Sequence, residues 1–174
     1  HLSVHSFPTR RSSDLQSLDF VVNSSNETPQ VNVDAGAEGD FLLGGPGDTQ
    51  GVFRIHTLLT VNHAGSGTLT FGQPLGSMGG TPGAVTKNGA GTAILSAANY
   101  YTGPTIANGG LLLVNGATTA AVGAVTINDT ATLGGTGIVG GDITLKDGGT
   151  VAPGASIGTL TVQDLTIEDG GNLD

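Results

Sequence analysis

The chain has 174 residues and a formal net charge of −9, with 31 glycines, no cysteine and no tryptophan. This length suits one elongated domain, the acidic balance argues against nucleic acid and anionic membrane surfaces as partners, and the missing cysteines exclude disulfides. No apolar run approaches the roughly 18–20 residues of a membrane-spanning helix, so we expect no membrane insertion of this segment.

The first segment, residues 1–15, is predicted to lie outside the fold. Its run Ser6-Phe-Pro-Thr-Arg-Arg-Ser-Ser-Asp-Leu15 resembles the in-frame translation of a common DNA-sequencing adapter. We therefore interpret residues 1–15 as an adapter artefact and residues 16–174 as the folded part. A basic tail with a binding role is the alternative.

Two phrases in the first half predict strands that end in glycine turns. They read Val31-Asn-Val-Asp-Ala-Gly36 and Leu59-Thr-Val-Asn-His-Ala-Gly65. Apolar and polar residues alternate in each, as they do along a half-buried strand, and glycine then lets the chain turn sharply. We interpret both as coils with longer corner loops near 44–51 and 72–84.

The same half contains two candidate metal-binding features. The run Gly44-Gly-Pro-Gly-Asp-Thr-Gln-Gly51 is similar to a calcium-binding nonapeptide repeat, but Asp48 arrives one position early and the motif occurs once. His56 and His63 lack a third ligand at useful spacing, so we interpret them as solvated loop histidines. We predict no metal ligands; a calcium-stabilised secreted repeat is the alternative.

A nine-residue phrase then recurs down the second half of the chain. Its second position is always threonine, and the steps between consecutive threonines are 19, 21, 18 and 22 residues. The threonines are Thr86, Thr105, Thr126, Thr144 and Thr166. A period near 20 built from strands and glycine turns, without a helical pattern, predicts a stacked coil of β-strands.

The residues on either side of these threonines are predicted to form the core. The threonines should point outward in one column about 5 Å apart, while their neighbours point inward. Lys87 and Pro104 stand at inward positions; we expect Lys87 to snorkel outward and Pro104 to cause a local bulge. The predicted inward residues are Val125, Ile127, Ile143, Leu145, Leu165 and Ile167, with Leu112, Leu133, Val151 and Leu173 in a second short strand.

Two short motifs resemble catalytic or cofactor signatures without their context. Gly154-Ala-Ser-Ile-Gly158 fits a nucleophile elbow, but no helix pattern follows and every histidine lies upstream of Ser156. Gly135-Thr-Gly-Ile-Val-Gly140 fits a dinucleotide-binding loop, yet another strand follows instead of a helix. We interpret both as corners and predict no catalytic or cofactor-binding residues.

Acidic and aromatic residues offer two further candidates. Asp129, Asp147 and Asp169 occupy matching or neighbouring turn positions, where aspartate bonds its own backbone; a cation site or a sugar-cleaving pair is the alternative. Tyr100-Tyr101 is the one aromatic pair. We favour a packed loop for it over a contact with a sugar or a protein partner.

The segment from Lys87-Asn-Gly-Ala-Gly-Thr-Ala-Ile-Leu-Ser to Leu111-Leu-Leu-Val-Asn-Gly116 resembles the autotransporter-associated β-strand repeat. Leu133-Gly-Gly-Thr-Gly-Ile-Val-Gly-Gly-Asp142 and Val151-Ala-Pro-Gly-Ala-Ser-Ile-Gly-Thr-Leu-Thr-Val162 resemble segments that follow it in autotransporter passengers. The resemblance implies a right-handed parallel β-helix exported through the outer membrane. It also implies a C-terminal β-barrel translocator outside this chain, and no catalytic residues carry over.

The predictions combine into one reading of residues 16–174. They should form an all-β, single right-handed parallel β-helix of six or seven coils. The predicted function is a structural, surface-exposed or secreted stalk, to which adhesion to a polysaccharide or protein could be added. The alternative is a polysaccharide-active β-helix enzyme, a lyase or hydrolase, which the scarcity of Lys and Arg on the outward faces disfavours.

Overall fold

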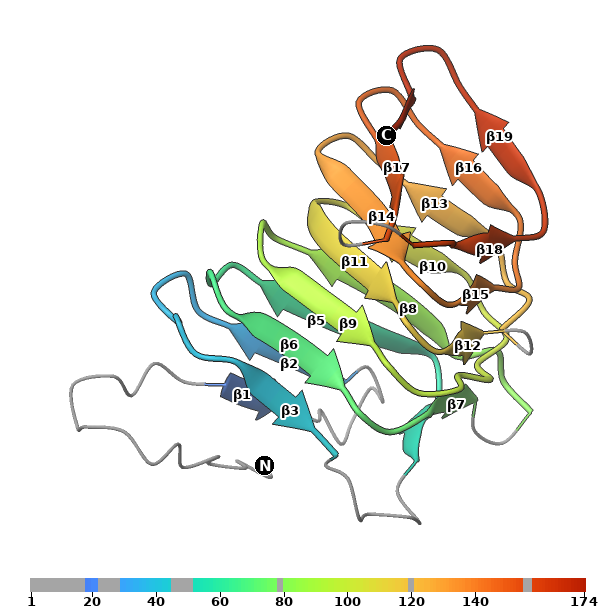
Figure 1. Cartoon of the computed structure of the whole chain (residues 1–174). Helices are drawn as coiled ribbons and strands as arrows, with labels where there is room; N and C mark the ends of the chain where they lie inside the picture. The colour runs from blue at the N-terminus through green and yellow to red at the C-terminus, as the bar shows by residue number, and fades with distance from the viewer. Residues whose placement is uncertain (1–17, 22–28, 45–51, 78–79, 119–120, 155–157) are drawn as a thin grey trace.

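The computed structural model describes residues 18–21, 29–44, 52–77, 80–118, 121–154 and 158–174 (Figure 1). Three sequence predictions lie outside these ranges. They are the adapter artefact at residues 1–15, most of the calcium-like run including Asp48, and the serine of the elbow-like motif, Ser156.

Most of the chain winds back and forth between two large sheets, called sheet A and sheet B below. The pairings within both are parallel, except that β1 joins β2 antiparallel. Sheet A contains β1 (Leu18–Val21), β2 (Gln30–Val33), β5 (Leu58–His63), β8 (Ala84–Asn88), β10 (Thr105–Ala107), β13 (Val125–Ile127), β16 (Ile143–Leu145) and β19 (Leu165–Ile167). Sheet B contains β3 (Phe41–Leu43), β6 (Thr68–Phe71), β9 (Thr92–Leu95), β11 (Gly110–Val114), β14 (Ala131–Gly135), β17 (Thr150–Pro153) and β20 (Asn172–Leu173).

A third side of shorter strands closes most of the coils (Figure 1). It is split into a pair, β4 (Phe53–Ile55) with β7 (Leu75–Ser77), and a trio, β12 (Ala117–Thr118), β15 (Ile138–Val139) and β18 (Thr161–Val162). The described residues include no helix. The expected solenoid of stacked parallel strands is therefore confirmed. The number of turns, about five, differs slightly from the six or seven coils expected.

The interior is a narrow apolar column enclosed by the three sides. Ile127, Ile143 and Leu145 are almost completely buried, as the alternating pattern predicts. The last coil differs: Leu165 is only half-buried, and Ile167 and Leu173 are 46% and 61% exposed. β19 and β20 are edge strands, so no further coil covers their apolar residues, and the predicted burial is wrong there.

The threonine column is shifted at one coil. Thr126, Thr144 and Thr166 pair in register as predicted, and Thr60 joins Thr86. In β10, however, Ile106 stands between Thr86 and Thr126. Thr105 instead takes the inward position opposite Val85 and Val125, so its predicted place in the column is wrong.

Pro104 lies one position before the paired residues of β10. It is exposed and directly precedes β10, where its missing N–H costs no ladder bond, and its carbonyl accepts a hydrogen bond from the Val85 N–H at 2.9 Å. The expected inward proline and local bulge are both wrong, because β10 pairs regularly with both neighbours.

The corner between sheets A and B turns through left-handed backbone in successive coils. Glycine occupies it at Gly110, Gly148 and Gly170, with φ of 64°, 74° and 85°. Between them, Thr130 adopts the same conformation with φ of 63°. A β-branched residue is strained there, so this coil departs from its neighbours at the turn.

Candidate functional site

A ladder of asparagine side chains crosses sheet A near the C-terminal ends of its strands. Each asparagine after the first donates its Nδ2 to the Oδ1 of the asparagine in the preceding coil, at 2.6–2.8 Å. The members of this asparagine ladder are Asn32, Asn62, Asn88, Asn108 and Asn128. Stacked identical amides satisfy one another only when the coils are in register, so the ladder fixes the stacking.

Charged residues continue the column beyond Asn128. Register places Lys146 and then Glu168 after it, and the Lys146 ammonium forms an ion pair with the Glu168 carboxylate. Both side chains are more than 40% exposed, so this pair adds little stability. The four hydrogen bonds between asparagine side chains each contribute about 0.5–1.5 kcal/mol to the stability of the fold. Of the outward columns described here, this one has the most continuous side-chain bonding.

Lys87 points into the interior, so the prediction that it snorkels outward is wrong. It is 1% exposed and aligned with Val61 and Ala107. Its Nζ donates to the carbonyls of Gly89 at 2.6 Å and Gly109 at 2.8 Å. Burial lowers its pKa to about 8, and the two carbonyls stabilise the ammonium that remains.

His63 lies next to this buried lysine, and its predicted place in a solvated loop is wrong. The side chain is fully buried at the end of β5, and neither ring nitrogen has a hydrogen-bond partner of good geometry among the described atoms. Burial lowers its pKa most and the positive charge of Lys87 lowers it further; the carbonyls of His63 and Gly65 oppose this. Gly91 leaves the room for the ring, since a Cβ there would lie 1.7 Å from Nδ1.

The three aspartates at the corners stack from coil to coil, but they are turn residues on the surface. Asp129, Asp147 and Asp169 follow directly on aligned positions of successive coils and are exposed. The Oδ1 atoms of Asp129 and Asp147 lie over Gly148 and Gly170, about 2 Å from where a Cβ would be. Among the described residues, no group of three His, Cys, Asp or Glu side chains has a geometry that could hold a metal ion.

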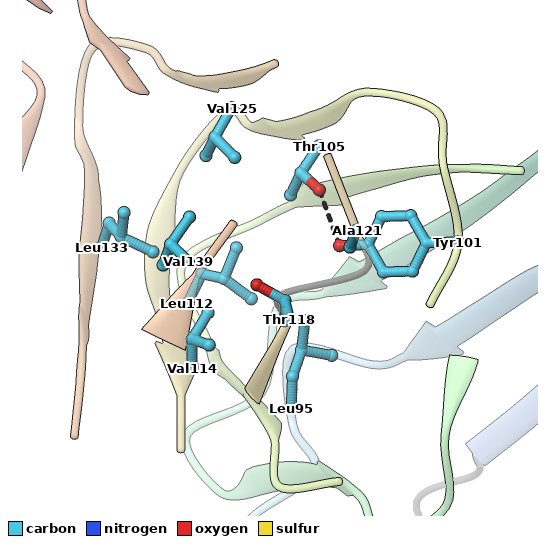
Figure 2. A pocket seen from close by; sticks show the side chains of 10 residues that line it. All are labelled: Leu95, Tyr101, Thr105, Leu112, Val114, Thr118, Ala121, Val125, Leu133 and Val139. Atoms are coloured by element: carbon cyan, nitrogen blue, oxygen red, sulfur yellow. Dashed lines mark hydrogen bonds between the residues drawn. The ribbon is translucent and has the colours of Figure 1, made fainter. Parts of the chain in front are cut away.

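The tyrosine pair divides between the interior and the surface. Tyr101 is 2% exposed and its hydroxyl hydrogen-bonds the Thr105 hydroxyl at 2.6 Å, while burial raises its pKa to about 12 (Figure 2). These two residues line a cavity of about 10 Å³, close to the minimum for one water molecule. Tyr100 is 37% exposed on the outer surface. The packed-loop interpretation therefore describes Tyr101 but not Tyr100.

The remaining candidates occupy ordinary positions. Gly135–Gly140 contains the end of β14, a corner and the whole of β15, so no helix N-terminus faces it. His56 follows β4 and is half-buried. The expected loop at 72–84 contains β7. The described residues include no helix with the length and apolarity to cross a bilayer.

Sequence reasoning missed the asparagine ladder, although a signal for it is present. Asparagine recurs at sequence separations of 30, 26, 20 and 20 residues along the ladder. The threonine phrases obscured this, because they were aligned one residue early at Thr105. Aligning Asn88, Asn108 and Asn128 instead gives the observed register.

Comparisons with known proteins agree with this architecture. Residues 85–114 match the Passenger-associated-transport-repeat family. A stretch of 73 residues is 42% identical to "Adhesin BmaC autotransporter" of Brucella suis biovar 1 (strain 1330), covering 42% of this chain and 2% of that protein. No solved structure matches the chain significantly. The chain therefore contains autotransporter passenger repeats.

Proposed function

We propose that this autotransporter passenger repeat region is a rigid stalk that holds other parts of its protein away from the cell. Passengers with such repeats are exported through the outer membrane to the cell surface or secreted. The asparagine ladder is the observation that carries the proposal. It ties five successive coils together side chain to side chain, which resists bending and slippage.

The wider protein supplies the other parts in this proposal. The chain spans about 2% of the length of the Brucella relative, so the partners and activity of the whole protein belong to the proposal. A C-terminal β-barrel translocator elsewhere in the full protein would export the stalk. The relative is named an adhesin, and we extend an adhesive role to this chain as the finer part of the proposal.

Lengthening the solenoid tests the stalk role. Residues 106–125 span one coil, because Thr105 and Val125 are register partners. Three extra copies inserted after Val125 should lengthen the molecule by roughly 14 Å, at about 4.8 Å per coil. Small-angle X-ray scattering measures the maximum dimension, and a shuffled insert of equal composition is the control. An unchanged dimension with native circular dichroism would contradict a rigid stalk.

We also propose that this region catalyses no reaction. The stacked aspartates support this, since they sit at turns over glycine instead of lining a cleft. The purified protein should show no turnover of acidic or neutral polysaccharides or of simple esters. Turnover that disappears in Asp147→Asn or Ser156→Ala would instead support the polysaccharide-active enzyme.

A further inference from the structure

Three outward positions line up across neighbouring coils on the third side. Arg54 of β4 pairs in register with Gly76 of β7, and Gly76 forms a parallel bridge with Tyr100. The residues on either side point inward: Ile55, Leu75 and Tyr101 are buried. Adjacent parallel strands lie about 4.8 Å apart, so Arg54 and Tyr100 flank a position without a side chain.

The ring of Tyr100 fills the space over Gly76. Its Cε2, Cζ and Oη atoms lie 2.3, 2.6 and 2.9 Å from where a Gly76 Cβ would be. The ring therefore leans along the column toward the coil that carries Arg54. It is the one exposed aromatic side chain among the residues whose burial is described.

The backbone that carries Tyr100 is fixed on both sides. Asn99 is 2% exposed; its Oδ1 accepts from the Leu75 N–H at 2.9 Å and its Nδ2 donates to the Ala97 carbonyl at 2.9 Å. Tyr101 is buried, and its hydroxyl is hydrogen-bonded to that of Thr105. An exposed aromatic ring held between two buried, hydrogen-bonded neighbours loses little conformational entropy on binding.

Arg54 carries a positive charge that pairs with no described residue. Its side chain is exposed and forms no ion pair or hydrogen bond within the described ranges. The other two cations there are engaged, since Lys87 is buried on two carbonyls and Lys146 pairs with Glu168. A guanidinium matches the geometry of a carboxylate, to which it can donate two parallel hydrogen bonds.

We propose that Arg54, Gly76 and Tyr100 form a binding site for a carboxylated saccharide unit, such as a uronic acid. The ring of Tyr100 offers an apolar face to the C–H bonds of a sugar, and Arg54 binds its carboxylate. The chain carries a net charge of −9, so a ligand with sparse carboxylates fits better than a dense polyanion. The site rests on the adhesive part of the proposed function and gives it a ligand class.

A short oligosaccharide that carries a single galacturonic acid unit tests this proposal with the full chain. The probes are the free acid, its methyl ester of equal length, and a neutral oligosaccharide; oligoglutamate tests for an acidic peptide. Saturation-transfer NMR and titration should show the free acid binding at least ten-fold more tightly than the ester, with affinity falling as salt rises. Equal binding of acid and ester would overturn the carboxylate assignment, and stronger binding of oligoglutamate would overturn the saccharide.

Substitutions then locate the site. Tyr100→Ala and Arg54→Gln should each weaken binding at least ten-fold, while Tyr100→Phe should keep it. Gly76→Ala adds one methyl group that must displace the ring of Tyr100. It should therefore weaken binding although Arg54 and Tyr100 are both still present. Lys146→Gln, which removes an exposed cation elsewhere, is the matched control. All variants should keep the wild-type melting temperature and scattering dimension, which separates this site from the stalk role. Undiminished binding by Tyr100→Ala or Gly76→Ala would refute the site.

Discussion

Two parts of the solenoid interior solve the same packing problem differently. Around Ile127 and Leu145 the column is aliphatic, and each inward residue is covered by similar ones in the coils on either side. Around β5 and β8 the same column holds a buried histidine and a buried lysine. A charge is accepted there because two glycine carbonyls lie within hydrogen-bond distance of Lys87. The repeat therefore dictates which positions point inward, whereas the local backbone decides whether a polar group can occupy them.

The aliphatic part should tolerate a charge least. Ile127→Asp buries a carboxylate without a partner, so we expect a loss of more than ~4 kcal/mol in the free energy of unfolding and cooperative melting of the stack. Thr126→Asp, on the outward side of the same strand, should cost less than ~1 kcal/mol. Urea denaturation measures both, and similar losses would place Ile127 outside the interior.

The polar part should respond to loss of its charge in a different way. Lys87→Met keeps the approximate length and apolar stem, but it leaves the Gly89 and Gly109 carbonyls without the ammonium. We expect a destabilisation of about 1–3 kcal/mol, the typical cost of orphaned buried polar groups. Thermal unfolding checks this, with Lys146→Met as the exposed control. A gain in stability would mean that the two carbonyls do not need the ammonium as a hydrogen-bond donor.

Stability should depend on pH through His63 and Lys87. Both pKa values are lowered in the folded chain, so the unfolded chain binds more protons and stability rises with pH in each window. For His63, stability present above pH 6.5 is lost as the pH falls through the folded pKa. For Lys87, stability increases from about pH 8 to about 10.5.

Denaturation midpoints between pH 4.5 and 10.5 test this dependence. His63→Leu should abolish the acid limb, while the contribution of Asp40, whose pKa is lowered by hydrogen bonds from Thr68, is lost only as the pH falls below about 5. Lys87→Met should abolish the alkaline rise. A flat profile in the wild-type chain would contradict burial of both groups.

The smallest expected effect concerns the strained corner. Thr130 adopts the left-handed conformation that glycine occupies at the equivalent corners. Thr130→Gly relieves this strain, partly offset by the greater freedom of glycine in the unfolded chain, and should stabilise by up to ~1 kcal/mol. The matched Gly148→Thr variant should lose stability. Destabilisation by Thr130→Gly would show that the threonine side chain contributes more than its backbone costs.

Much of the fold could be predicted from the sequence because period and alternation are encoded residue by residue. The phrases at Leu59, Val85, Val125 and Ile143 all became sheet A strands. The misaligned phrase at Pro104 could not be corrected by periodicity, since Thr105 and Ile106 both suit a strand. The asparagine that follows decides the register, through bonds that form only once coils stack.

The candidate site was less predictable, for physical reasons. Lys87 can occupy its inward position because the carbonyls of Gly89 and Gly109 accept hydrogen bonds from its ammonium, and one of these carbonyls belongs to another coil. The column of Arg54, Gly76 and Tyr100 joins residues separated by 22 and 24 positions, outside the repeating phrases. Only the pairing of β4 with β7 and the bridge at Gly76 bring them together.

Disulfide crosslinking tests the stacking register most directly, because the chain contains no cysteine. Thr86→Cys with Ile106→Cys places two cysteines on the same face of adjacent strands with their Cα atoms about 4.8 Å apart, within the Cα–Cα range for a disulfide. This pair should oxidise rapidly and raise the melting temperature. Thr86→Cys with Thr105→Cys should not crosslink in the native state, since Thr105 faces the interior. Preferential crosslinking of the second pair would contradict the register on which the asparagine ladder and the stalk depend.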